Sequence, residues 1–287
     1  MKKINSFIVI GGDSRQLYMA EYLETLGYDI SVYGLPETTY KCISDLKQTI
    51  SESDAVILPL PVTKDGKYIY SVVPIKETAD EILSFIKPEQ PVFAGMISKG
   101  LEGKIKNKKA NVYDYFRREE VTVMNTVPTV QGILKAIIDN IDYTILSSRC
   151  AVFGYGRVGK ATADTLSSLG ADITVCVRKC SDIALAQTKG YNGCMISDFY
   201  KFANKYNIII NTVPSLVIDK KILENVRADC LIIDVSSAPF GTDFTTAYEL
   251  GINAIQCSSL PGKVAPKSAG KIIAEGVLNI IREEFDG

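Results

Sequence analysis

The sequence predicts an α/β protein in which two doubly wound, Rossmann-like parallel-sheet domains flank a cleft. Short runs of β-branched residues alternate with amphipathic stretches, which is typical of parallel strands connected by helices. This alternation runs through the first half of the chain and restarts after residue 149. A chain of 287 residues is also long enough for about two domains of ordinary size.

The same pattern predicts the individual strands and helices. The first half is expected to contain strands at 7–10, 29–33, 54–58 and 91–94 and helices at 14–26 and 76–86. The second half is expected to contain strands at 150–153, 172–177, 208–210, 230–235 and 252–256 and a helix at 157–169. The basic stretch 99–109 is expected to be a solvated surface segment.

The predicted domains cover residues 1–127 and 149–266, and a connecting helix lies within 128–148. Pro128 suits the start of that helix, because the first helical turn needs no N–H group there. An amphipathic helix within 267–287 is expected to pack back on the first domain, by analogy with two-domain dehydrogenases.

Charge and hydropathy exclude several classes of protein. The 32 basic and 33 acidic residues give a net charge of −1, so no basic face for nucleic acid or for a membrane surface is predicted. No apolar run is long enough to cross a bilayer, and the N-terminus lacks the apolar core of a signal peptide. We therefore expect a cytoplasmic protein with no nucleic-acid or membrane partner.

The chain contains no histidine, which excludes His-based triads, His metal sites and the His base of typical 2-hydroxy-acid dehydrogenases. Its seven cysteines form no C-x-x-C pair, and five of them lie in or beside apolar, strand-like runs. We expect these thiols to be reduced and mostly buried, and we expect no metal site.

A glycine-rich motif stands where a dinucleotide-binding unit requires it. Gly154-Tyr155-Gly156-Arg157-Val158-Gly159 fits the pattern G-x-G-x-x-G and lies between a predicted strand and a predicted helix. Gly154 allows a tight turn, Gly156 allows the backbone to approach a pyrophosphate, and Gly159 allows close helix–strand packing. The N–H groups at the start of the helix favour phosphates. The alternative is a structural turn without a ligand.

The end of the second strand of this unit favours NADP over NAD. Sites for NAD usually have Asp or Glu there, about 20 residues after the glycines. Here Arg178 and Lys179 occupy that position, followed by Ser181, and they suit a 2′-phosphate. Asp182 is expected to cap the following helix. NADP is the predicted cofactor, with NAD as the alternative.

Later segments complete the predicted cofactor groove. Asn211-Thr212-Val213-Pro214 and the segment from Asp234 to Ser236 follow strands, and Pro261 with Gly262 is expected to fix a turn. Asp234 has an equally good interpretation as the anchor of its own loop. The predicted cofactor-binding residues are Gly154, Tyr155, Gly156, Arg157, Val158, Gly159, Arg178, Lys179, Ser181, Asn211, Thr212, Val213, Pro214, Asp234, Ser236, Pro261 and Gly262.

The first domain opens with another glycine turn, Gly11-Gly12-Asp13-Ser14-Arg15, whose helix is expected to offer N–H groups to an anion. Arg15 gains nothing from the helix dipole there, which indicates a substrate carboxylate as its partner. The alternative partner is a nearby acid of the protein. Asp13 is one candidate for the proton acceptor, beside lysine, tyrosine, thiolate and water. Lys267 begins the last helix near the predicted cleft.

The two halves share a short segment. Asn125-Thr126-Val127-Pro128-Thr129 is matched by Asn211-Thr212-Val213-Pro214-Ser215. Each copy is expected to follow a strand and precede a helix, which would place both at carboxyl ends of strands, where ligands bind. Chance similarity is the alternative.

Six stretches together resemble the family formed by the A subunit of dipicolinate synthase from endospore-forming bacteria. They are I-G-G-D-S-R-Q at 10–16, N-T-V-P-T-V-Q-G at 125–132, G-Y-G-R-V-G at 154–159, N-T-V-P-S at 211–215, D-V-S-S-A-P-F-G-T-D-F at 234–244 and L-P-G-K-V-A-P-K-S-A-G at 260–270. The family pattern has an Arg in the segment that here reads Ser236-Ser237-Ala238-Pro239. The resemblance therefore assigns that loop no carboxylate clamp.

The resemblance implies an NADP-dependent subunit that acts with a flavoprotein-like B subunit in the mother cell during sporulation. Its reaction would oxidise a dihydro- or hydroxytetrahydrodipicolinate to dipicolinate. The candidate catalytic residues are Asp13, Arg15, Asn125, Thr129 and Lys267. A homo-oligomer is compatible with the sequence. The alternatives are an alanine-dehydrogenase-like or hydroxy-acid dehydrogenase, and a nucleotide-binding regulatory subunit without catalytic activity.

Overall fold

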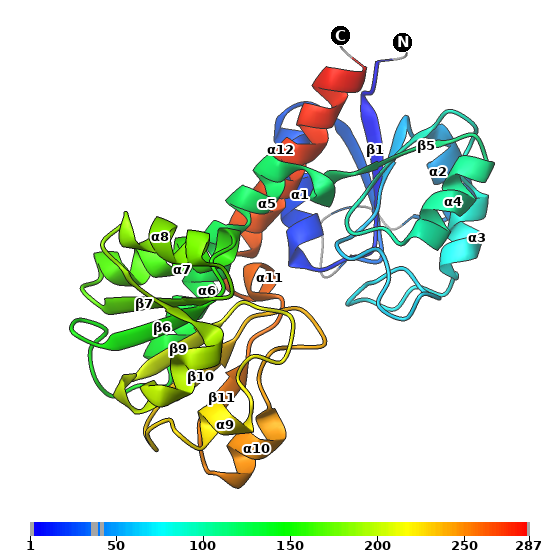
Figure 1. Cartoon of the computed structure of the whole chain (residues 1–287). Coiled ribbons are helices and arrows are strands. Elements are labelled where there is room, and N and C mark those ends of the chain that lie inside the picture. The colour runs from blue at the N-terminus through cyan, green and yellow to red at the C-terminus, as the bar shows by residue number, and fades with distance from the viewer. Residues whose placement is uncertain (1–2, 36–39, 41–42, 286–287) are drawn as a thin grey trace. The chain divides into compact units, whose positions relative to one another are not determined.

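Two parallel sheets, each covered by helices, make up the chain (Figure 1). The computed structural model describes residues 3–35, 40 and 43–285. It divides into two units, Met1–Asn125 with Ala265–Gly287, and Thr126–Val264. The two parallel sheets confirm the predicted fold class, and the cleft between the domains stays a prediction.

The first unit contains a five-stranded sheet in the order β2-β1-β3-β4-β5, parallel throughout. Its strands are β1 (Ser6–Ile10), β2 (Asp29–Tyr33), β3 (Ala55–Ile57), β4 (Pro91–Ala94) and β5 (Asn111–Asp114). Alternate residues of β1 enter two separate cores, with Phe7 and Val9 on one face and Ile8 and Ile10 on the other. A strand buried on both faces has to be apolar at every position, which explains why the sequence predicts β1 so clearly.

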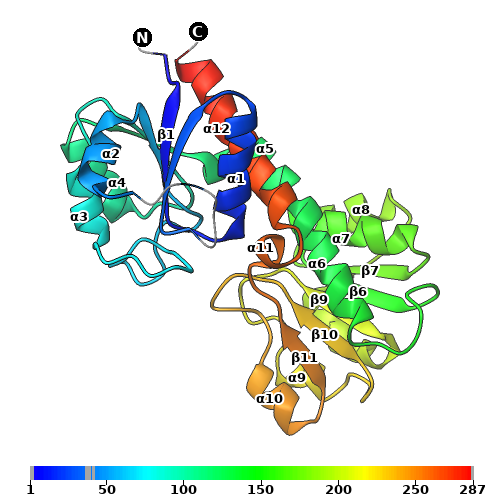
Figure 2. The same ribbon diagram turned by 180° about the vertical axis from the view of Figure 1, so that it is seen from behind.

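The C-terminal helix belongs to the first unit. The helices here are α1 (Ser14–Thr25), α2 (Leu46–Glu52), α3 (Ala79–Ser84), α4 (Lys99–Asn107), α5 (Glu119–Met124) and α12 (Pro266–Glu284). As predicted, α12 returns to this unit, where it lies beside α1 (Figure 2). Gly270 allows this contact, because a Cβ atom there would lie 2.4 Å from the carbonyl oxygen of Arg15.

The second unit contains a six-stranded parallel sheet in the order β11-β10-β9-β6-β7-β8. Its strands are β6 (Arg149–Phe153), β7 (Asp172–Val177), β8 (Asn192–Met195), β9 (Ile208–Asn211), β10 (Leu231–Asp234) and β11 (Asn253–Gln256). Its helices are α6 (Thr126–Ile138), α7 (Arg157–Ser168), α8 (Cys180–Gln187), α9 (Lys220–Leu223), α10 (Phe244–Glu249) and α11 (Leu260–Val264). The strand order reverses between β6 and β9, and ligands of such sheets bind beyond the strand ends at this point.

Several elements differ from their predicted form. Strands β5 and β8 were not predicted, because both lie at a sheet edge and contain polar residues. Most of the stretch 99–109 forms α4, in which Leu101 and Ile105 are buried four residues apart while the lysines of the helix are exposed. The predicted turn at Pro261 and Gly262 is the short helix α11, whose Leu260 packs on α6 in the core of the second unit.

The helix in the middle of the chain begins before Pro128 and ends at Ile138, well before residue 148. Pro128 lies in its first turn, where a missing N–H group is tolerated. Asn125 follows α5 and not a strand, so the predicted equivalence of segments 125–129 and 211–215 is wrong. Only the second copy follows a strand, at Asn211.

Within the described residues, the single stretch Glu119–Ile138 is long and apolar enough to cross a membrane by composition alone. It consists of α5 and α6, on either side of Asn125. Val121 is buried in the first unit, and Ile133 and Ile137 are buried in the second. Burial within the protein therefore accounts for these three residues, whereas Val123, Met124, Val127 and Ile138 of the same stretch are exposed.

Candidate functional site

The glycine turn between β6 and α7 is held in shape by two close contacts. Gly154 has a φ of +90°, and a Cβ atom on it would lie 2.5 Å from Oγ1 of Thr212. A Cβ atom on Gly159 would lie 2.2 Å from the carbonyl oxygen of Gly154. Both positions therefore require glycine, the first for backbone conformation and the second for helix–strand packing.

Gly156 is different, because the space above it is open. A Cβ atom there would meet no heavy atom of the described residues within 4 Å. Gly156 is also the N-cap of α7, and no side chain caps that helix. A helix that begins at such a glycine presents its first N–H groups and the positive end of its dipole to an anion, which fits a dinucleotide pyrophosphate.

Two cations stand where β7 ends. Val177 is the last residue of the strand, and Arg178 and Lys179 follow it with exposed side chains. Lys179 is the N-cap of α8, and no side chain caps this helix either. Asp182 lies in the first turn of α8 and is not its cap, which corrects the predicted role. The exposed Ser181 lies in the same turn, so cations, a hydroxyl and helix N–H groups share one end of β7.

The end of β9 supports the glycine turn from the side. The hydroxyl of Thr212 donates to the carbonyl oxygen of Phe153 at 2.8 Å. Asn211 is fully buried, and its amide donates to the carbonyl oxygen of Val213 and accepts from the N–H of Val213. These bonds fix the wall next to Gly154, while Pro214 is exposed beyond it.

Asp234 is the anchor of the loop that follows β10. Its carboxylate is fully buried and accepts five hydrogen bonds, from Asn211 Nδ2, Ser236 N and Oγ, Gly241 N and Thr242 Oγ1. All five bonds come from groups of the protein itself. In this structure Asp234 and Ser236 therefore anchor their own loop. Their contribution to a cofactor site is to hold the loop in place.

The remaining predicted cofactor residues lie at varied depths. Tyr155 is buried against the core, Val158 is half-buried, and Arg157 is exposed. Val213 and Pro261 are buried, and Gly262 is half-buried.

In the first unit, Asp13 and Arg15 are bound to each other. The guanidinium of Arg15 donates from Nε to Asp13 Oδ1 and from Nη2 to Asp13 Oδ2, both at 2.9 Å. Nη2 also donates to the carbonyl oxygen of Leu60 at 2.8 Å. The exposed fraction of Arg15 is only 6%, so this is a nearly buried ion pair. A nearby acid, the alternative partner considered above, is therefore present.

The pairing sets the charge of Asp13. Burial acts to raise its pKa, but hydrogen bonds and charge from Arg15 outweigh that effect, so the pKa lies below 3.8. A carboxylate with such a pKa is ionised at neutral pH and is a weak proton acceptor. Its observed role is to hold the guanidinium.

The first glycine turn is closed by the protein itself. The side chain of Asp13 accepts from the N–H of Arg15, and Gln16 Oε1 accepts from the N–H of Asp13, which forms a capping box. The N–H groups of Gly11 and Gly12 donate to the carbonyl oxygens of Tyr33 and Tyr70. The prediction of free N–H groups at the start of α1 is therefore wrong.

Tyr70 and Lys64 complete this cluster, and sequence reasoning missed them. The hydroxyl of Tyr70 lies 3.3 Å from Asp13 Oδ2, and Nζ of Lys64 lies 3.7 Å from the centre of the Tyr70 ring. Both residues belong to the segment after β3. The proline pair at Pro59 and Pro61 marks that segment as a loop at a strand end, but nothing in it indicates a contact with Asp13.

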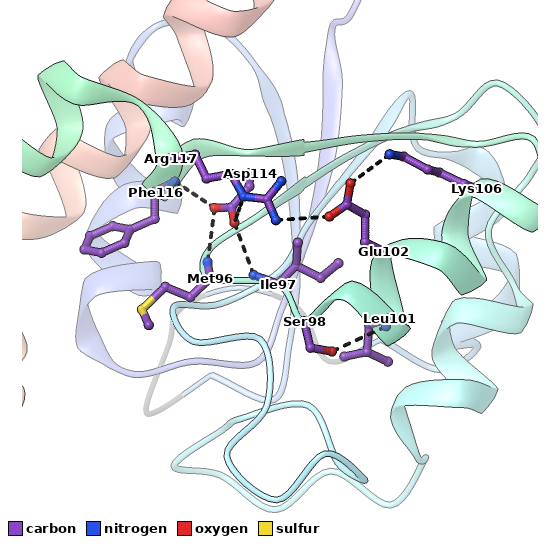
Figure 3. Close-up of polar contacts among 9 residues, drawn as sticks. All are labelled: Met96, Ile97, Ser98, Leu101, Glu102, Lys106, Asp114, Phe116 and Arg117. Carbon is purple, nitrogen blue, oxygen red and sulfur yellow. Dashed lines mark hydrogen bonds and ion pairs between the residues drawn. The ribbon is translucent and has the colours of Figure 1, made fainter. Parts of the chain in front are cut away.

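A second loop of this unit is fixed by Asp114 at the end of β5 (Figure 3). Its Oδ1 accepts from the N–H groups of Met96 and Phe116, and its Oδ2 accepts from the N–H of Ile97. Nε of Arg117 lies 3.3 Å from the same carboxylate. These bonds hold the segment after β4 in place. Met96 in this segment has a φ of +53° and an exposed side chain.

The other predicted catalytic residues lie on other elements of the two units. Lys267 is exposed in the first turn of α12 and lines a cavity of about 380 Å³ with Tyr18 and Lys271. Asn125 is half-buried at the end of α5 in the first unit, and Thr129 is half-buried in α6 of the second. Their meeting at one substrate stays a prediction.

Comparisons with known proteins match both units. Residues 6–116 match the family model of the N-terminal domain of the dipicolinate synthase A subunit. Residues 144–278 match that of the acetohydroxy acid isomeroreductase NADPH-binding domain. The second unit with its open glycine turn is thus a nicotinamide-dinucleotide domain, and the chain is of the oxidoreductase type.

Relatives of similar length cover nearly the whole chain. The dipicolinate synthase A subunit of Bacillus subtilis (strain 168) is 31% identical over 282 residues, which are 96% of this chain and 95% of the relative. The crystal structure of the A subunit from Bacillus halodurans is 29% identical, covers 98% of both chains and superposes with a TM-score of 0.85. An L-alanine dehydrogenase superposes with a TM-score of 0.60 over 96% of this chain and 90% of its own, but at 13% identity it shows the fold alone.

Proposed function

Because the chain belongs to the family of the dipicolinate synthase A subunit, we propose that it oxidises a partly reduced pyridine dicarboxylate to dipicolinate with NADP. The substrate would be a dihydrodipicolinate or a hydroxytetrahydrodipicolinate. The observation that supports this most is the uncapped, open turn at Gly156 beside the exposed Arg178 and Lys179.

The reaction is a dehydrogenation that forms an aromatic ring. A dihydrodipicolinate loses one hydride and one proton to become dipicolinate, and a hydroxytetrahydrodipicolinate first loses water. NADP, when bound, supplies the hydride acceptor. Aromatic stabilisation makes the oxidation strongly favourable, so the protein chiefly has to orient the ring and match its charges.

The residues proposed to bind the cofactor lie at the ends of two neighbouring strands, β6 and β7. The first N–H groups of α7 would hold the pyrophosphate, because the N-cap Gly156 has no side chain to cap the helix. Arg178, Lys179 and Ser181 would hold the 2′-phosphate through charge-assisted hydrogen bonds. An unpaired carboxylate in that position would repel the phosphate, and neither residue after β7 is acidic. This arrangement favours NADP over NAD.

On the substrate side, Arg15 is the proposed carboxylate-binding residue. Its Nε and Nη2 are bonded to Asp13 and Leu60, so Nη1 is the nitrogen left for a substrate oxygen among the described contacts. Asp13 would keep the guanidinium in that orientation. Asn125, Thr129 and Lys267 remain proposed contacts for the second carboxylate.

The proposal also includes a partner subunit and a cellular location. Membership of an A-subunit family implies a second subunit, and the family resemblance indicates a flavoprotein-like B subunit. We propose that both act in the cytoplasm of the mother cell during sporulation, with no nucleic-acid or membrane partner. A homo-oligomer is compatible with this arrangement.

The test is an assay of the purified full-length chain with NADP and a hydroxytetrahydrodipicolinate, with and without the B-type subunit. Nucleotide absorbance would follow NADPH, and chromatography would follow dipicolinate. We expect both products in equal amounts. A chain that binds NADP but never reduces it, even with its partner, would instead be a nucleotide-binding regulatory subunit.

The same assay distinguishes the other enzymatic alternative. Alanine and small 2-hydroxy acids replace the dicarboxylate, and turnover with either would identify a dehydrogenase of that kind. We expect none, because the chain lacks the histidine that hydroxy-acid dehydrogenases use as a base.

A further inference from the structure

Two cysteines of the second unit face each other on neighbouring strands. Cys176 on β7 and Cys194 on β8 are direct partners in the parallel register. Their sulfur atoms lie 3.3 Å apart. Adjacent strands are about 4.8 Å apart, which is within the range of Cα separations that a disulfide spans. Sulfur atoms at about 2.0 Å would close the bond, so the approach required is only about 1 Å.

The two thiols differ in accessibility. Cys176 is fully buried, whereas Cys194 is half-buried and lines a cavity of about 320 Å³. Arg149, Lys205 and Asp172 line the same cavity, so it can admit a charged small molecule. Since β8 is the edge strand of the sheet, it has only one neighbour and can shift toward β7.

The environment also favours a reaction at Cys194. Burial raises the pKa of the Cys176 thiol, so that thiol stays protonated. The hydrogen bond between the two sulfur atoms lowers the pKa of Cys194, which increases its thiolate fraction. A reactive, accessible thiol next to a buried resolving thiol is the usual composition of a redox-sensitive pair.

We propose that Cys176 and Cys194 form a modification site that small-molecule disulfides oxidise to an intramolecular disulfide. The Cys194 thiolate attacks one sulfur of the disulfide, forms a mixed disulfide and releases one thiol. The Cys176 thiol then gives up its proton as its sulfur attacks the sulfur of Cys194, and the second thiol leaves with that proton. The small molecule gains two electrons, and the two cysteine protons leave with its two thiols.

The pair lies directly against the dinucleotide turn. The backbone carbonyl of Cys176 accepts from the N–H of Gly154 at 2.9 Å, and Arg178 follows two residues later along the chain. A disulfide that draws β8 toward β7 therefore displaces both the glycine turn at Gly154 and the side chain of Arg178. This second part of the inference rests on the proposed function, and it predicts that oxidation changes the Kd for NADP at least threefold.

The experiment treats the full-length chain with glutathione disulfide and maps its peptides by mass spectrometry. We expect a Cys176–Cys194 cross-link, a fall in free thiols from seven to five, and full reversal by a dithiol. Cys176→Ala should accumulate glutathione on Cys194, because the resolving thiol is missing. Cys194→Ser should leave residue 176 unmodified, because the accessible thiol is missing. Cys257→Ser is the matched control, in which a half-buried thiol is removed elsewhere and the cross-link persists.

Three outcomes would overturn the proposal. The first is modification of the exposed Cys180 without any Cys176–Cys194 cross-link. The second is glutathione on residue 176 in a folded Cys194→Ser chain, with folding checked by circular dichroism. The third is an unchanged Kd for NADP in the cross-linked chain, which overturns the link to the cofactor. The mapping needs no nucleotide, and the reduced chain's own affinity for NADP tests the proposed function separately.

Discussion

The two units each place a glycine turn between the first strand of a sheet and a helix, yet the two turns are opposites. At Gly12, a Cβ atom would lie 2.4 Å from the side chain of Gln16, and Asp13 caps α1. At Gly156, a Cβ atom would meet nothing within 4 Å among the described residues, and no side chain caps α7. One turn is filled by its own chain and the other is left open.

The difference teaches what a glycine turn needs in order to bind an anion. Both turns have glycine, a strand before them and a helix after them. Only the second turn begins its helix without a side-chain cap, which favours an anionic ligand at the helix N-terminus. In the first unit the Asp13 carboxylate occupies that place and also binds the guanidinium of Arg15.

The largest effect is expected at Gly159, where the second turn touches its own strand. Gly159→Ala would place a Cβ atom 2.2 Å from a backbone oxygen that cannot rotate away. We expect the free energy of unfolding to fall by about 3 kcal/mol, as for other overpacked positions. Urea unfolding followed by circular dichroism measures this. A change below about 0.5 kcal/mol would show that the contact is not tight.

Gly156→Ala tests the open space directly. The new methyl group has room in the protein, so stability should stay within about 0.5 kcal/mol of the parent. The same group enters the space of the pyrophosphate, and we expect the Kd for NADP to rise about 100-fold, or about 2.7 kcal/mol. Fluorescence titration measures it. Gly12→Ala is the control, which should lower stability and leave the Kd unchanged. If Gly156→Ala lowered stability and Gly12→Ala raised the Kd, the proposed difference between the two turns would be wrong.

Arg178→Ala sharpens the assignment of the cofactor. Loss of a charge-assisted hydrogen bond to a 2′-phosphate should weaken NADP by about 30-fold, or about 2 kcal/mol, and NAD by less than about threefold. Titrations with both nucleotides measure the ratio. Lys189→Ala removes another exposed charge, beyond the far end of α8, and should change neither affinity. Equal losses for NADP and NAD in Arg178→Ala would exclude the 2′-phosphate proposal.

The smallest effect is expected for Asp13→Asn in the closed turn. The variant loses the charge that pairs with Arg15, which should lower stability by about 1.5 kcal/mol without affecting NADP binding. Because the folded pKa of Asp13 lies below 3.8, its stabilising contribution is full at about pH 5 and above. It is lost as the pH falls through the lowered pKa. Unfolding measured between about pH 2 and 7 should show the two curves converge at low pH; a constant difference would contradict the pairing.

Much of the fold could be read from the sequence. Inner strands with a continuous apolar run, such as residues 7–10 of β1 and 208–210 of β9, are easily predicted, because both faces of a parallel sheet are buried. The edge strands β5 and β8 are not, since none of their residues is fully buried and polar residues interrupt the apolar pattern. The repeated segment N-T-V-P led to a wrong prediction of two equivalent strand ends. The first copy follows a helix at Asn125 and only the second follows a strand at Asn211, so identical residues stand in different local structures.

The sequence by itself determined the dinucleotide turn. Its function depends on local spacing, with glycines at Gly154, Gly156 and Gly159 and cations at the end of the next strand. The tertiary structure decided the surroundings of the other turn. Its Asp13–Gln16 capping box is local, but the carbonyls that accept from Gly11 and Gly12 belong to the distant residues Tyr33 and Tyr70. The tertiary structure also decided the pairing of Cys176 with Cys194, which requires the register of two strands. Short-range geometry is encoded in neighbouring residues, whereas the partner of a polar side chain is fixed only when the chain folds.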